Sequence, residues 1–152
     1  MSPFYFLVLG SLALSALASL WRGGPWERAT AAVLVIAWIG TAFAPFDFVH
    51  PPWIAIAIDT AVFLFLLYAA VFSGRRWTLA AAAFQFLILA THFVFVQDES
   101  LEQWAYVSAY YVWNLAVILS LAGGVVWRFR DGPSRRRPQD RTLRSHRNQP
   151  RP

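Results

Sequence analysis

The chain has 152 residues, of which 58% are hydrophobic and 14% are charged. Soluble domains contain about 45–50% hydrophobic and about 25% charged residues, so this composition is typical of a membrane protein. The absence of cysteine excludes disulfide scaffolds, thiolate metal sites and cysteine nucleophiles. The sequence contains no catalytic or nucleotide-binding motif, and we therefore expect a protein that is not an enzyme.

Five apolar stretches come close to the roughly 20 residues that a helix needs to cross a bilayer core about 30 Å thick. They cover residues 4–21, 29–45, 53–72, 77–96 and 104–127. We predict an all-α, polytopic integral membrane protein, with residues 1–127 forming a bundle of five transmembrane helices. Residues 16–18 resemble a signal-peptide cleavage site, but the start of the chain carries no positive charge, which favours a retained helix.

Helix-terminating residues separate these stretches. Pro25 and the proline pair at 51–52 lie where a helix begins, at positions whose amide has no acceptor within the helix. Gly74 is a plausible helix stop, and Ser100 with Gln103 fits a capping box for the fifth helix.

The arginine distribution predicts the orientation. All 13 basic residues are arginines, and on a five-pass chain every one falls on the same side. Cytoplasmic loops carry the excess of arginine and lysine, so we predict that the N-terminus is outside and the C-terminus cytoplasmic. The expected location is the inner membrane of a bacterial cell.

The basic charge is concentrated at the end of the chain. Residues 1–127 contain four arginines and six acids, whereas residues 128–152 contain nine arginines and two acids. This tail has almost no apolar residues, so we predict that it is disordered and binds anionic lipid headgroups. The expected contacts are Arg128, Arg130, Arg135, Arg136 and Arg137. Aromatic residues stop at Phe129, which argues against nucleic acid as the partner.

Tryptophan gives an independent indication of the helix ends. Six of the eight tryptophans fall at predicted membrane boundaries, where the amphipathic indole is favoured: Trp21, Trp26, Trp53, Trp77, Trp104 and Trp127. Trp38 and Trp113 lie within the predicted bilayer interior, where we expect them to contribute to packing.

Four polar residues at membrane depth are the candidate functional residues, because an ionisable group there is costly. They are Asp59, Gln85, His92 and Asn114. Gln85 and His92 are seven residues apart, so they project from one helix face with Ala81 and Ile88. The short connection at 73–76 makes the third and fourth helices antiparallel neighbours, and we predict that Asp59 and His92 approach each other.

A second polar and aromatic face is predicted on the fifth helix, formed by Tyr106, Tyr110, Trp113 and Asn114. Ser11 and Thr41 have comparable depth, so a polar pocket that opens outward is geometrically feasible. We take Asp59, His92, Gln85, Asn114 and Tyr110 as ligand or ion candidates. The alternative is that these groups form only structural hydrogen bonds between helices.

Metal and haem sites are the weaker alternatives. His50, His92, Asp47 and Asp59 lie toward the same predicted surface, but no pair has the spacing of a ligand motif. We therefore expect no metal or cofactor. Small residues such as Ser11, Ser15 and Ser19 allow helices to pack closely, either within the bundle or in a homo-oligomer.

The topology resembles that of the tryptophan-rich sensory protein (translocator) family. The shared features are five helices, many tryptophans and an external N-terminus. The resemblance implies binding of porphyrins or sterol-like ligands. The family's tryptophan and proline signature belongs to the first connection, whereas Pro51, Pro52 and Trp53 lie in the second, and only Asn114 loosely matches its asparagines. The resemblance therefore extends to topology and assigns no site residue.

These observations lead to three functional hypotheses. The first is an accessory or scaffold component of a membrane assembly, with the lipid bilayer and a membrane-protein partner or a second copy as its contacts. The second is a small transporter or hydrophobic-ligand-binding protein that uses a buried pair of Asp59 and His92. The third is a phage-type holin, suggested by the small size and the basic tail. A buried Asp59 beside a cavity would favour the second hypothesis, and a tightly filled bundle would favour the first.

Overall fold

The computed structural model describes residues 3–43, 52–97 and 103–130, and all regular structure in these ranges is helical. The five helices are α1 (Pro3–Arg22), α2 (Pro25–Ala42), α3 (Trp53–Ser73), α4 (Arg76–Gln97) and α5 (Gln103–Arg130). The predicted all-α fold with five helices is therefore confirmed.

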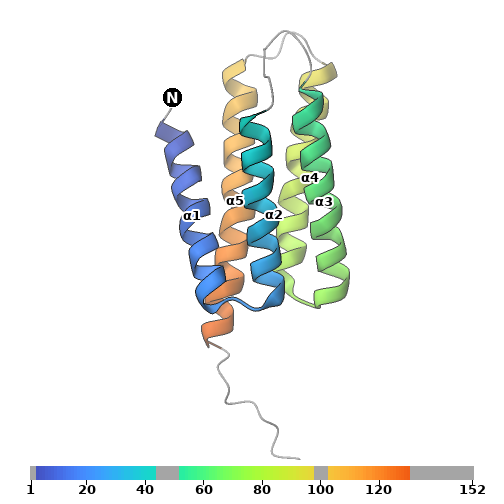
Figure 1. Cartoon of the computed structure of the whole chain (residues 1–152). Helices are drawn as coiled ribbons and strands as arrows, with labels where there is room; N and C mark the ends of the chain where they lie inside the picture. The colour runs from blue at the N-terminus through green and yellow to red at the C-terminus, as the bar shows by residue number, and fades with distance from the viewer. Residues whose placement is uncertain (1–2, 44–51, 98–102, 131–152) are drawn as a thin grey trace, which may run out of the picture.

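The helices form an antiparallel bundle in which each helix packs beside the next one in the chain (Figure 1). The last helix, α5, returns to pack against both α4 and α1, so the five helices close into a ring. The N-terminal end of α2 lies at the same end of the bundle as the turn between α3 and α4 and the C-terminal end of α5. We call this the arginine end, because Arg22, Arg28, Arg75, Arg76 and Arg128 are located there.

Four helices are long and apolar enough to cross a membrane: α1, α3, α4 and α5. α2 is not among them; it has 18 residues and carries Glu27 and Arg28 near its start. Large apolar side chains cover the outside of the bundle, such as Leu14 on α1, Ile36 on α2 and Phe93 on α4. An apolar exterior around a bundle with buried polar groups is the arrangement expected in a membrane.

Three helix boundaries differ from the sequence prediction by three residues or more, and one of them is the end of α2, which lies at Ala42 and not at residue 45. α2 begins at Pro25, earlier than the predicted start at residue 29, because proline occupies the first helical position and Glu27 caps the helix terminus. α5 continues past residue 127 to Arg130, so the first arginines of the predicted tail are helical. Gly74 ends α3 in the left-handed conformation, with a φ of 63°, as predicted. Ser100 of the predicted capping box lies outside the described residues.

The apolar core occupies the centre of the ring and receives side chains from all five helices, including Leu12, Leu34, Leu66, Ile88 and Leu121. The predicted inward face of α4 is confirmed. All four of its residues are almost completely buried: Ala81, Gln85, Ile88 and His92.

A glycine allows α4 and α5 to approach closely near the arginine end. A Cβ atom placed on Gly124 would lie 2.7 Å from the Trp77 ring, whereas the adjacent Gly123 has no neighbour within 4 Å. Trp77, expected at a membrane boundary, thus packs its ring on the α5 backbone. Four of the other predicted boundary tryptophans are exposed: Trp21, Trp53, Trp104 and Trp127.

Candidate functional site

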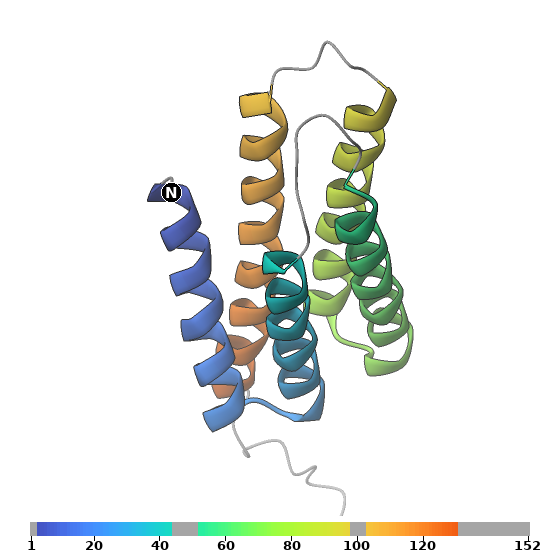
Figure 2. The ribbon, with the colours of Figure 1, turned by 45° about the horizontal axis from the view of Figure 1, so that its top comes forward.

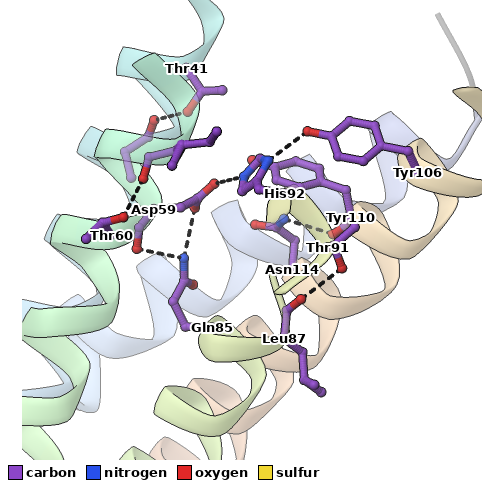
Figure 3. A network of polar contacts seen from close by, with 12 residues as sticks. Thr41, Asp59, Thr60, Gln85, Leu87, Thr91, His92, Tyr106, Tyr110 and Asn114 are labelled. Carbon is purple, nitrogen blue, oxygen red and sulfur yellow. Dashed lines mark hydrogen bonds and ion pairs between the residues drawn. The ribbon is translucent and has the colours of Figure 1, made fainter. Parts of the chain in front are cut away.

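The polar residues singled out in the sequence lie close together inside the bundle (Figure 3). Asp59 lies in the second turn of α3, and α4 supplies Gln85 and His92 from two positions on one face. Tyr106 comes from the first turn of α5. Three helices that are adjacent in the ring therefore contribute to one hydrogen-bonded network.

Asp59 is the centre of this network. The Gln85 amide nitrogen donates to Asp59 Oδ1 at 2.8 Å, and His92 Nε2 lies 2.9 Å from Asp59 Oδ2. The Tyr106 hydroxyl lies 2.8 Å from His92 Nδ1. The predicted contact between Asp59 and His92 is therefore confirmed as a direct one, and both residues are buried.

The hydrogen bonds limit where the protons lie. If His92 is neutral, Nε2–H donates to Asp59 and Nδ1 accepts from the Tyr106 hydroxyl. If His92 is protonated, both ring nitrogens donate, and the Tyr106 oxygen accepts. The same geometry thus accommodates a change of one proton without moving a heavy atom.

A cavity of about 380 Å³ adjoins Asp59. Its wall combines polar and aromatic side chains from all five helices, including Asp59, Gln85, Asn114, Trp38 and Tyr110. The wall also includes Thr41 of α2, at the depth predicted for it, but not Ser11 of α1. Figure 2 shows that α2, whose second half lines the cavity, ends short of the neighbouring ends of α4 and α5.

Most other polar groups within the helices bond within their own helix. Asn114 donates to the Tyr110 carbonyl at 2.9 Å, and several hydroxyls bond to the carbonyl four residues earlier: Ser11, Ser19, Thr41, Thr60, Thr91 and Ser120. Such bonds satisfy the side chain locally and do not join helices. Hydrogen bonds between helices thus set Asp59, Gln85, His92 and Tyr106 apart from the rest of this group.

The aromatic residues of the predicted α5 face divide between two roles. Tyr110 lines the cavity and packs beside His92, with ring centroids 5.7 Å apart. Trp113 instead stacks on Phe84 of α4 at 6.4 Å, which agrees with the packing role expected for it. Trp38, expected to serve in packing as well, lies on the cavity wall and contacts Tyr5.

Sequence reasoning missed a second buried carboxylate, at the arginine end. Glu27 is completely buried, and its Oε2 accepts a hydrogen bond from the Gly24 backbone at 2.9 Å. Its Oε1 pairs with the Arg75 guanidinium, and Arg128 Nη1 lies 4.0 Å from Oε2. Gly24 and Glu27 stand on either side of Pro25 at the spacing of a capping box, and this signal could have identified Glu27 from the sequence.

This second cluster joins parts of the chain that are far apart in sequence. Glu27 belongs to α2, Arg75 to the turn before α4 and Arg128 to the last turns of α5. Two buried side-chain atoms have no hydrogen-bond partner within the described residues: Thr30 Oγ1, close to Glu27 in sequence, and Trp77 Nε1, close to Arg75 in sequence. Arg128, predicted to contact lipid, lies against Gly24 with its side chain 45% exposed.

The described residues contain no group of three or more histidine, aspartate or glutamate side chains that could hold a metal ion. Asp47 and His50 of the metal alternative lie outside the described residues, as do Arg135, Arg136 and Arg137. The side chain of Arg130 is likewise outside them. The lipid contacts expected of these arginines stay predictions.

A scan against protein-family models and searches of curated proteins and solved structures found no match to this chain. The arguments for function therefore depend on the site itself. The resemblance to the tryptophan-rich sensory proteins stays one of topology.

Proposed function

We propose that this chain is a non-enzymatic, multi-pass membrane protein that binds a small hydrophobic molecule in the cavity beside Asp59. The observation that carries the proposal is the cavity of about 380 Å³ with a buried carboxylate on its wall. Ligand pockets have volumes of about 300–1,000 Å³ and combine apolar walls with a few polar groups. This cavity fits that description.

The cavity favours ligand binding over the scaffold hypothesis. A protein that serves only as a packing partner gains stability from a filled interior, because an unfilled volume loses dispersion contacts. Here the unfilled space adjoins the costliest buried side chain of that half of the bundle, Asp59. A bound molecule that contacts Asp59 would offset both penalties.

The position of the cavity supports access from one end. The arginine end is held together by the Glu27 cluster, whereas the cavity lies beside the second half of α2. We propose that all five helices cross the membrane, with the arginine end in the cytoplasm. A cysteine introduced at Ser100 should then react with an impermeant reagent on intact cells, and one at Ser134 should not.

The binding proposal is tested by filling the cavity. Ala37 lines it, whereas Ala32 on the same helix is exposed and does not. We expect native mass spectrometry of the detergent-purified protein to detect a bound small molecule. Ala37→Leu should abolish the bound mass, and the matched Ala32→Leu should retain it, with melting temperatures confirming that both variants fold. Wild-type protein that is folded yet free of any small molecule would overturn the proposal.

A further inference from the structure

The Asp59 carboxylate lies between two different environments. On one side it forms part of the cavity wall together with Gln85. On the other side it bonds to His92, which does not line the cavity and which bonds in turn to Tyr106 (Figure 3). A molecule in the cavity thus reaches the carboxylate without displacing the imidazole.

The charge of this site must be balanced. An ionised carboxylate with a neutral histidine leaves one uncompensated negative charge among apolar helices, which is costly. In the empty site, one proton shared by Asp59 and His92 removes that charge, whether it lies on the carboxyl group or on the imidazole. A cation in the cavity would remove it equally well.

In the part of the chain that the structure describes, the neighbouring groups leave Asp59 and His92 as the acid–base unit of the site. Four tyrosines line the cavity or contact the pair: Tyr5, Tyr106, Tyr110 and Tyr111. Tyrosine hydroxyls are protonated and uncharged at neutral pH. α2 contributes Trp38 and Thr41 to the cavity wall. Its described titratable residues, Glu27 and Arg28, lie near the arginine end and do not line the cavity.

The cavity wall has the chemistry that recognises an organic cation. Aromatic rings attract cations through their faces, and Trp38, Tyr110 and Tyr111 lie on the same wall as the Asp59 carboxylate. Among the described residues, no arginine lines the cavity. A volume of about 380 Å³ suits an organic molecule, and a single carboxylate balances one positive charge.

We propose that the cavity takes a monovalent organic cation, and that binding of the cation releases one proton from the Asp59–His92 pair. This inference rests on the proposed function, because it names the ligand class for the same cavity. The exchange conserves charge, since one positive charge enters from the cavity as one leaves on the opposite side of the carboxylate.

The hydrogen bonds provide the route for the proton. When the shared proton of the empty site lies on His92, Nε2 donates to Asp59 and Nδ1 donates to Tyr106. When the cation binds, the Tyr106 oxygen takes the Nδ1 proton and its own hydroxyl proton passes to water. Neutral His92 keeps Nε2–H on Asp59 and accepts from the Tyr106 hydroxyl. No bond other than those to protons changes.

The test compares two compounds of the same shape in the full chain in lipid nanodiscs. Benzyltrimethylammonium carries a permanent charge, and 2,2-dimethylpropylbenzene is its neutral isostere. We expect the cation to bind at least about tenfold more tightly. One proton per cation should be released into weakly buffered solution. Because one proton leaves for each cation bound, the Kd of the cation should rise about tenfold for each unit of decreasing pH.

Variants separate the parts of the proposal. Asp59→Asn keeps the shape but removes the charge, so the two compounds should bind within about threefold of each other and release no proton. Thr91→Ala, beside His92 but outside the cavity wall, should retain both properties. Tyr106→Phe should leave the Kd of the cation unchanged and slow the proton release.

The outcomes distinguish this inference from the proposed function. Equal binding of the two compounds to the wild type, or cation binding without proton release, would overturn the exchange. If the neutral compound binds and Ala37→Leu abolishes its binding, the proposed function survives that result. If neither compound binds, the inference fails, and the native mass spectrum alone then decides the proposed function.

Discussion

The two ends of the bundle each bury one carboxylate, and they neutralise it differently. At the arginine end, Glu27 accepts a backbone hydrogen bond from Gly24 and pairs with two arginines, Arg75 and Arg128. In the opposite half, Asp59 bonds to Gln85 and to His92 and forms part of a cavity wall. One carboxylate has permanent counter-charges, and the other has a counter-charge that a proton can switch.

This difference separates a cluster of fixed charges from the cluster to which we assign ligand binding. Arginine stays protonated in proteins, so the Glu27 cluster keeps one charge state at every physiological pH. The imidazole of His92 can instead carry one proton or two, and its hydrogen bonds to Asp59 and Tyr106 fit both forms. The first arrangement joins distant segments, and the second is the one to which we assign the proposed exchange of a proton for a cation.

The same chemical change in the two carboxylates should have different effects on stability. Glu27→Gln should lower the free energy of unfolding by about 1–3 kcal/mol, because it removes the counter-charge of two arginines that are themselves partly exposed. Asp59→Asn should cost less than about 1 kcal/mol, since its amide can donate to His92 and accept from Gln85. Unfolding in mixed detergent micelles measures both values.

A matched control accompanies this pair. Arg28→Gln, on an exposed side chain next to Glu27, should change stability by less than about 0.5 kcal/mol. If Asp59→Asn destabilises the protein as much as Glu27→Gln, the contrast between the two carboxylates is wrong.

The close contact between α4 and α5 gives a smaller expected effect, limited to packing at the arginine end. Gly124→Ala should destabilise the bundle by about 1–2 kcal/mol, because the new methyl group would collide with the Trp77 ring. Gly123→Ala changes the adjacent residue, where space is open, and should stabilise the helix by up to about 1 kcal/mol. Melting temperatures of the two variants should therefore shift in opposite directions, and equal shifts would contradict the packing described.

Much of this arrangement could be predicted from the sequence, for physical reasons. A bilayer fixes the length of an apolar helix, so the helices were identifiable from hydropathy and from breaks such as Gly74. The contact of Asp59 with His92 followed from a short turn and the helix rise, because both residues are nearly equidistant from that turn. The seven-residue spacing of Gln85 and His92 placed the amide on the same face.

The rest depends on packing between helices that are distant in sequence. Glu27 falls in a predicted connection between two apolar stretches, and only the folded ring brings Arg75 and Arg128 to it. Because Glu27 was counted among the connecting residues, the predicted start of α2 at residue 29 was too late. The cavity was foreseen only as a feasible pocket, because an unfilled volume is what remains after all the side chains have packed, and no local pattern encodes it.

The smallest effect on stability is expected from removal of residues 131–152, which follow α5 in the chain. Truncation after Arg130 retains Arg128 and hence its approach to Glu27. The removed residues contain almost no apolar side chains, so the melting temperature should change by less than the Gly124→Ala variant changes it. The truncation also removes seven arginines and two acids, so binding to anionic liposomes should weaken and lose most of its salt dependence. A loss of stability as large as that of Glu27→Gln would instead place the tail in the cluster of fixed charges, with its arginines packed on the bundle and not directed to lipid.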